Sequence, residues 1–92
     1  MKNKVFISGK VSGLNIAVAF LKFREAEVQL TKWGYETVNP MRLCKPSWSW
    51  FRCMIVCLWH LTWCDKIYLL DNWHESRGSR IEYKYAKFLG KI

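Results

Sequence analysis

Glu82 is the residue of this sequence best placed to do chemistry. It comes after a short apolar segment at residues 67–70 and a loop at residues 72–79, and it stands near the start of a helical pattern that Gly90 ends. A carboxylate there is expected in the first turn of a helix, close to the carboxyl end of a buried strand, where α/β proteins bind ligands. A carboxylate held at that position is placed for chemistry.

Helix capping is the other role that the sequence allows for Glu82. Ser79 stands three residues before it, and the pair fits the Ser-x-x-Glu capping box, in which the glutamate reaches back to the amide of the capping residue. Capping boxes are common and catalytic glutamates are rare. The pattern leaves both roles open.

A first buried strand is expected at residues 4–8, and the loop GKVSG follows it at residues 9–13. Glycines and serines in such a loop can bring backbone amides close to a phosphate. The spacing matches neither the Walker pattern nor the dinucleotide fingerprint, so a plain turn is the alternative. The candidate ligand contacts here are Ser8, Gly9, Ser12 and Gly13.

The rest of the chain alternates helices and strands. A helix is expected at residues 15–33, a strand at residues 36–38, a loop at residues 41–49 and an amphipathic helix from Trp50 onward. Gly34 is expected to end the first of these helices. The expected buried positions of this first helix are Val18, Leu21, Ala26, Leu30 and Trp33. Those of the second helix are Trp50, Met54, Cys57, Leu58 and Leu61.

These elements predict one α/β domain over residues 1–92. We expect a three-layer α/β/α arrangement of the flavodoxin-like or Rossmann-like kind. Its parallel sheet should have at least three strands in the order 2-1-3, with helices on both faces and right-handed crossovers.

Three segments resemble a small family of domains of unknown function related to the nucleoside 2-deoxyribosyltransferases and the deoxynucleoside 5'-monophosphate N-glycosidases. They are KVFISGKVSGL, GYETVNP and CDKIYLLDNWHESRGSRIEYKYAKFLG, which occur in the family's order and span nearly the whole chain. The pattern Ser76-x-Gly78-x-x-x-Glu82 followed by Ala86 is similar to the one that holds the nucleophile of the characterised relatives. The resemblance implies that Glu82 attacks the anomeric carbon and that Ser76 and Gly78 lie near the sugar or its 5' phosphate. A serine rather than an aspartate at Ser76 favours a phosphorylated ligand.

The resemblance therefore implies N-glycosidic bond cleavage or 2-deoxyribosyl transfer on a nucleoside or nucleotide. The relatives carry another catalytic acid upstream of the third strand, but residues 53–62 contain no Asp or Glu. Cys57 or His60 would have to replace it, or the proton donor comes from elsewhere. A nucleotide-binding module with weakened catalysis and a basic interaction protein are the alternative functions.

Two further candidates follow strands. Asn39 ends the strand at residues 36–38, a position that often carries ligand contacts. Trp73 follows the segment at residues 67–70 and could stack on a nucleobase or pack against its own loop. The sequence leaves both possibilities for Trp73 open.

Composition suggests the partners. The net charge of +8 comes from 15 basic and 7 acidic residues without any run of either, so it suits an anionic ligand but does not favour nucleic acid. Six Trp in 92 residues are more than one small core hides, which predicts a homodimer. No apolar run reaches the roughly 18 to 20 residues of a membrane span, and no signal-peptide pattern is present. We expect a cytoplasmic protein without membrane contact.

The cysteines do not fit a metal site in the sequence. Cys53, Cys57, His60 and Cys64 share one helical face but extend over roughly 16 Å at 1.5 Å per residue, too far to surround one zinc ion. No CxxC pair is present. We therefore expect free, buried cysteines, with no disulfide, no metal and no cofactor.

Overall fold

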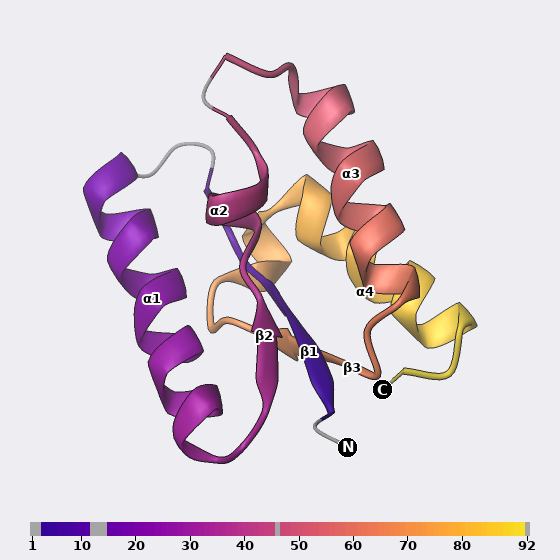
Figure 1. Cartoon of the computed structure of the whole chain (residues 1–92). Helices are drawn as coiled ribbons and strands as arrows, with labels where there is room; N and C mark the ends of the chain where they lie inside the picture. The colour runs from indigo at the N-terminus through magenta and orange to yellow at the C-terminus, as the bar shows by residue number, and fades with distance from the viewer. Residues whose placement is uncertain (1–2, 12–14, 46, 92) are drawn as a thin grey trace.

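A parallel sheet with β1 (Lys4–Ser8) at its centre organises the molecule (Figure 1). The computed structural model describes residues 3–11, 15–45 and 47–91. Within these ranges β1 pairs with β2 (Glu36–Val38) on one side and with β3 (Lys66–Leu69) on the other. The predicted strand order 2-1-3 is confirmed, and β3 begins one residue earlier than the apolar segment suggested.

Helices cover both faces of the sheet, which confirms the three-layer α/β/α arrangement (Figure 1). One face is covered by α1 (Ile16–Lys32). The other face is covered by α3 (Trp50–Thr62) and α4 (Arg77–Phe88). Short turns of helix, α2 (Pro40–Leu43) and η1 (Trp73–Glu75), lie in the connections.

Alternation along β1 sends successive side chains to opposite faces of the sheet. Val5 and Ile7 pack on the α1 side, in a buried cluster with Phe23, Ala26, Leu30 and Leu70. Phe6 packs on the other side, in a buried cluster with Cys57, Leu61, Cys64 and Ala86. Ser8 follows the same alternation as Phe6, so its side chain faces α4.

The first helix is confirmed, but its buried face is rotated from the predicted one. The buried positions are Ala19, Phe23, Ala26 and Leu30, whereas Val18, Leu21 and Trp33 are exposed. The predicted set combined apolar residues from two sides of the helix, and only contact with the sheet determines which side is buried. Gly34 ends the helix in a left-handed conformation with φ 90°, which glycine adopts without steric strain.

Residues 41–49 are not the continuous loop that we expected. They include the short α2, whose N-cap Asn39 accepts a hydrogen bond from the backbone N–H of Met41 at 3.0 Å. Pro40 stands at its first position, where a missing N–H removes no helical bond. The predicted helix α3 is confirmed, and it buries Met54, Cys57 and Leu61. Trp50, which was also expected to be buried, is 43% exposed.

In the described ranges, no helix combines the length and the apolar character needed to cross a membrane.

Candidate active site around Glu82

Glu82 lies in α4 on the face that packs toward β1, and only 5% of it is exposed. Ser8, the last residue of β1, donates a hydrogen bond from its hydroxyl to Oε1 of Glu82 at 2.6 Å. The two residues are 74 positions apart in the sequence. Strand and helix together therefore fix a buried carboxylate at the carboxyl end of the central strand.

The capping-box interpretation of Glu82 is wrong, because α4 begins one turn earlier than predicted. Its N-cap is Ser76, whose Oγ accepts a hydrogen bond from the backbone N–H of Ser79 at 3.1 Å. Ser79 is thus inside the helix, and Glu82 lies in the second turn rather than the first. Both Ser76 and Ser79 are residue types suited to the N-cap position. The helix begins after Ser76, because this start places Gly78 and Ser79 in the protein interior.

Burial changes the acidity of Glu82. Desolvation raises the pKa of its carboxyl from 4.5 to about 7, although the hydrogen bond from Ser8 acts in the opposite direction. A carboxyl with this pKa exchanges its proton near neutral pH, and its ionised form can act as a nucleophile.

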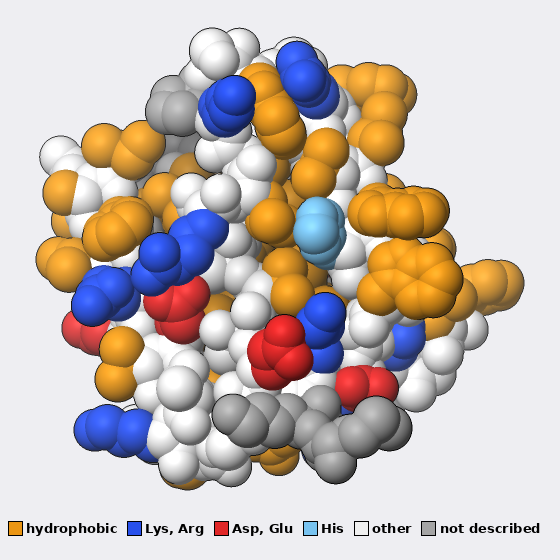
Figure 2. Space-filling view, viewed as in Figure 1, with side chains coloured by type: hydrophobic (Ala, Val, Ile, Leu, Met, Phe, Trp, Pro, Cys, Tyr) orange, Lys and Arg blue, Asp and Glu red, His pale blue; other side chains and the backbone are white. Residues whose placement is uncertain are grey.

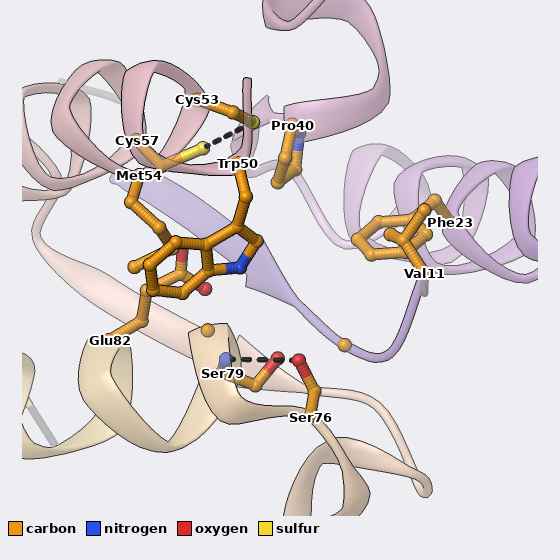
Figure 3. A pocket seen from close by; sticks show the side chains of 12 residues that line it. Val11, Phe23, Pro40, Trp50, Cys53, Met54, Cys57, Ser76, Ser79 and Glu82 are labelled. Atoms are coloured by element: carbon orange, nitrogen blue, oxygen red, sulfur yellow. Dashed lines mark hydrogen bonds between the residues drawn. The ribbon is translucent and has the colours of Figure 1, made fainter. Parts of the chain in front are cut away.

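Glu82 lines a pocket of about 490 Å³, including the part open to solvent (Figure 3). Segments that follow all three strands contribute to it: Gly9 and Val11 after β1, Pro40 after β2, and α4 after β3. The remaining wall is largely the start of α3, which provides Trp50, Cys53, Met54 and Cys57.

Close packing of α3 against α4 shapes the pocket floor. A Cβ added to Gly78 would lie 3.0 Å from Sδ of Met54 and 3.7 Å from Nε1 of Trp50, so glycine permits this approach. Figure 3 shows the indole of Trp50 reaching from α3 toward α4. The guanidinium of Arg77 lies over this indole, with Cζ 5.0 Å from the ring centroid.

Ser79 is a buried hydroxyl at the pocket. It is 1% exposed, and its Oγ has no hydrogen-bond partner within the part of the chain that the structure describes. Such a group is costly to bury unpaired. Because Ser79 lies in the first turn of α4, the hydroxyl and the helix N-terminus could serve one anionic ligand together.

The pocket brings together several of the residues predicted from the sequence. Gly9, Ser76, Gly78 and Glu82 line it, and Ser8 lies beside Glu82 through its hydrogen bond. The predicted residues Ser12 and Gly13 lie outside the described residues.

Asn39 and Trp73 do not line the pocket. Asn39 is buried as the cap of α2, and its Nδ2 donates to Oε2 of Glu27 at 3.5 Å. Trp73 packs against Tyr83 and His74, with ring centroids 4.8 Å and 4.4 Å away. Of the two possibilities left open for Trp73, the structure therefore has the indole packed against its own surroundings.

Of the two residues that could replace the missing catalytic acid upstream of β3, Cys57 lines the pocket and His60 does not. Cys57 is 2% exposed. Burial and, second, the charge of Glu82 raise the pKa of its thiol to about 12, so the thiol keeps its proton at neutral pH.

Other pocket residues, such as Val11, Phe23 and Ser79, were missed because apolar side chains and a presumed cap carry no chemical signal in the sequence.

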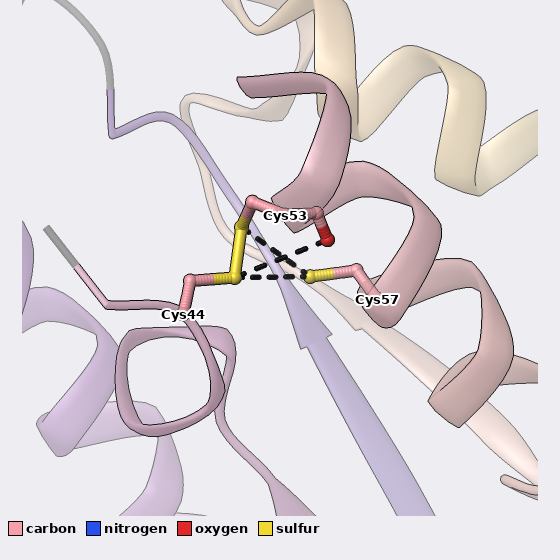
Figure 4. A group of neighbouring side chains, drawn as sticks. All are labelled: Cys44, Cys53 and Cys57. Atoms are coloured by element: carbon pink, nitrogen blue, oxygen red, sulfur yellow. Dashed lines mark hydrogen bonds between the residues drawn. A yellow bond between two sulfur atoms is a disulfide. The ribbon is translucent and has the colours of Figure 1, made fainter. Parts of the chain in front are cut away.

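A disulfide joins Cys44 to Cys53, which corrects the expectation of free cysteines (Figure 4). Their Cα atoms are 5.5 Å apart, a separation that a disulfide spans readily. Cys53, Cys57 and Cys64 follow one another along a single stretch of helical pattern, whereas Cys44 comes from the segment after α2 that folds back on α3. Cys57 and Cys64 are free and buried.

Comparison with known proteins places the chain in a family. No curated protein matches the sequence. No solved structure matches the chain either. A family profile described as "Domain of unknown function (DUF4406)" matches residues 3–92, almost the entire chain. The chain therefore belongs to the DUF4406 family.

Proposed function

We propose that the pocket binds a nucleoside or nucleotide and that Glu82 acts as the nucleophile in cleavage or transfer at its N-glycosidic bond. The observation that carries the proposal is the buried Glu82 carboxylate, which lines a pocket at the carboxyl ends of the strands and is held there by Ser8. The resemblance of the Ser76-x-Gly78-x-x-x-Glu82 pattern to the nucleoside 2-deoxyribosyltransferases and N-glycosidases supplies the substrate class.

The reaction would proceed in two steps. An ionised Glu82 attacks the anomeric carbon, the bond to the base breaks, and a glycosyl ester forms on the carboxylate. Water or an acceptor base then displaces the carboxylate from the sugar. The departing base takes a proton from a donor, for which the protonated thiol of Cys57 is the candidate on the α3 wall.

A 5' phosphate would bind at the N-terminus of α4. The supporting features are the unpartnered hydroxyl of Ser79 in the described residues, the helix N-terminus itself and the guanidinium of Arg77 at the rim. We predict that deoxynucleoside monophosphates protect the protein against thermal unfolding more than the nucleosides do. Ser79→Ala should remove this difference, while Ser47→Ala, at an exposed position, should keep it. Equal protection by both ligand classes would rule out the phosphate contact.

A binding module without turnover is the second candidate. It is favoured by one feature: among the described residues that line the pocket, Glu82 is the sole carboxyl group, whereas glycosyl transfer normally uses two. Cys57 is a much weaker acid than a carboxyl group.

Release of free base from a panel of deoxynucleosides and their monophosphates tests the proposal. Glu82→Gln should stay folded and bind ligand, while turnover falls by several orders of magnitude, because an amide cannot form the glycosyl ester. Glu25→Gln, which changes an exposed carboxylate of α1, is the matched control and should keep full turnover. Equal turnover by wild type and Glu82→Gln would refute the mechanism. Binding without turnover in both would favour the binding module.

We also propose that the protein forms a homodimer through the exposed aromatic face of α3. Phe51, Trp59 and Trp63 are each more than 60% exposed, and Figure 2 shows hydrophobic side chains gathered on the flank that α3 forms. A cytoplasmic location and the absence of a nucleic acid partner stay predictions from the sequence.

A further inference from the structure

Three sulfur atoms meet between α3 and the segment that precedes it (Figure 4). Sγ of Cys57 lies 3.8 Å from Sγ of Cys44 and 3.9 Å from Sγ of Cys53. The ligand atoms of the three cysteines lie within 4.8 Å of one another. The disulfide thus has a third cysteine in contact with both of its sulfurs.

These separations match the spacing of thiolates around a metal ion. A tetrahedral zinc site with Zn–S bonds of about 2.3 Å places its sulfurs about 3.8 Å apart. Two of the three sulfur pairs already have this spacing. The disulfide holds the third pair, Cys44 and Cys53, at bonding distance. After reduction, rotation of these side chains would bring the two sulfurs to the spacing found around a metal ion.

The backbone suits a site made of three cysteines better than a site made of four ligands along one helix, which the sequence already excluded. Cys53 and Cys57 stand four residues apart on adjacent turns of α3, and Cys44 reaches them from a separate segment. The ligands therefore converge from two directions instead of extending along one helix. Cys64 comes after the end of α3 and does not belong to this cluster.

We propose that, in the reduced protein, Cys44, Cys53 and Cys57 bind one thiophilic metal ion, with zinc as the ion that fits best. Reduction of the disulfide takes two electrons and two protons from a thiol reductant, whose two thiol groups become a disulfide. Binding of Zn²⁺ by three thiolates then releases three protons. Water from the pocket would fill the fourth position, because Cys53 and Cys57 also line that pocket.

The site shares Cys57 with the proposed function, in which this thiol is the candidate proton donor. Metal binding needs neither Glu82 nor a nucleotide, so a test without nucleotide separates the two proposals. Three sulfur ligands also select among metals: they favour zinc and other thiophilic ions over magnesium or calcium, which prefer oxygen.

Metal titration of the reduced protein tests this inference. The full chain is reduced without oxygen by a phosphine, which is converted to its oxide with water as the oxygen source and contributes no thiol ligands. Cd²⁺ is then added, and its thiolate charge-transfer absorption is followed. We expect one Cd²⁺ per chain, displaceable by Zn²⁺ and unaffected by Mg²⁺. The oxidised protein should bind at least tenfold more weakly.

Serine variants identify the ligands. Cys44→Ser, Cys53→Ser and Cys57→Ser should each weaken binding at least tenfold, whereas Cys64→Ser, the matched control at another buried cysteine, should bind like wild type. A reduced wild type that binds no better than the Cys57→Ser variant would overturn the proposal, as would an effect of Cys64→Ser equal to that of the other three.

Circular dichroism keeps the test decisive if reduction or a substitution unfolds the chain. Refolding of the reduced wild type and of Cys64→Ser at one Zn²⁺ per chain, but not of Cys57→Ser, would support the site, because metal binding then supplies folding free energy. Failure of Zn²⁺ to refold the reduced wild type would refute it.

Discussion

At the scale of single residues, two opposing influences act on Glu82. Burial disfavours its charged form, and the hydroxyl of Ser8 favours it by donating to Oε1. Burial is the larger influence, so the carboxyl holds its proton up to about pH 7. A side chain that prefers to be neutral in the folded protein but ionises when exposed must make stability depend on pH.

We predict that Glu82→Gln stabilises the protein at alkaline pH relative to wild type. Between pH 4.5 and about 7 the folded state binds more protons than the unfolded state, so wild-type stability falls as pH rises through this window. The neutral glutamine lacks this loss. The difference in unfolding free energy between the variant and wild type should therefore grow by up to about 3 kcal/mol from pH 4.5 to pH 8.

Denaturant unfolding across this pH range measures the difference, with Glu25→Gln, at an exposed carboxylate of α1, as the matched control. A difference for Glu82→Gln that does not change with pH would show that the buried carboxyl titrates normally.

The sequence identified Glu82 and its neighbours Ser76 and Gly78 because they form a local pattern. It could not identify Ser8 as the hydrogen-bond partner, since the two residues are 74 positions apart and nothing local relates them. Cys44 was missed for the same reason: it meets Cys53 only because the chain turns back after α2.

At the scale of elements, the start of α4 determines where Glu82 points. Ser76 rather than Ser79 caps this helix, and the extra turn buries both Gly78, which lies close to Met54 and Trp50 of α3, and Ser79. The elements themselves could be predicted, because strands and helices have strong apolar periodicities. The exact cap could not, since two serines three residues apart are equally suitable in local terms.

We predict opposite results for alanine at these two serines. Ser76→Ala should lower the unfolding free energy by about 1 kcal/mol, because the backbone N–H of Ser79 loses its partner. Ser79→Ala should leave stability unchanged or slightly higher, since it removes a buried hydroxyl without a partner in the described residues and adds a better helix former. Chemical denaturation of both variants at neutral pH provides the comparison. A larger loss for Ser79→Ala than for Ser76→Ala would restore the capping role of Ser79.

At the scale of the whole molecule, the apolar surface is distributed unevenly. The inner face of α3 packs on β1 and α4, whereas its outer face exposes Trp59 and Trp63, which lie edge to face with centroids 5.8 Å apart. An aromatic pair of this kind is typical of the centre of a protein interface.

We predict that Trp59→Glu shifts the protein from dimer to monomer. A buried charge in place of an anchoring indole should weaken self-association by roughly 10- to 100-fold. Val28→Glu places the same charge on an exposed apolar position of α1 and should leave the dimer intact. Sedimentation velocity distinguishes the species, and a wild type that is monomeric at high micromolar concentration would contradict the prediction.

The separation of Ser8 and Glu82 along the chain also affects when the site can exist during synthesis. At about 5 to 20 residues per second, a ribosome that has added Ser8 needs roughly 4 to 15 s to reach Glu82, 74 positions later. Until α4 emerges, the growing chain contains β1 but lacks the Glu82 carboxylate to which Ser8 donates its hydrogen bond. Glu82 therefore gains its unusual acidity only at the end of folding, and a chain stalled before α4 would be a nascent polypeptide without the candidate nucleophile.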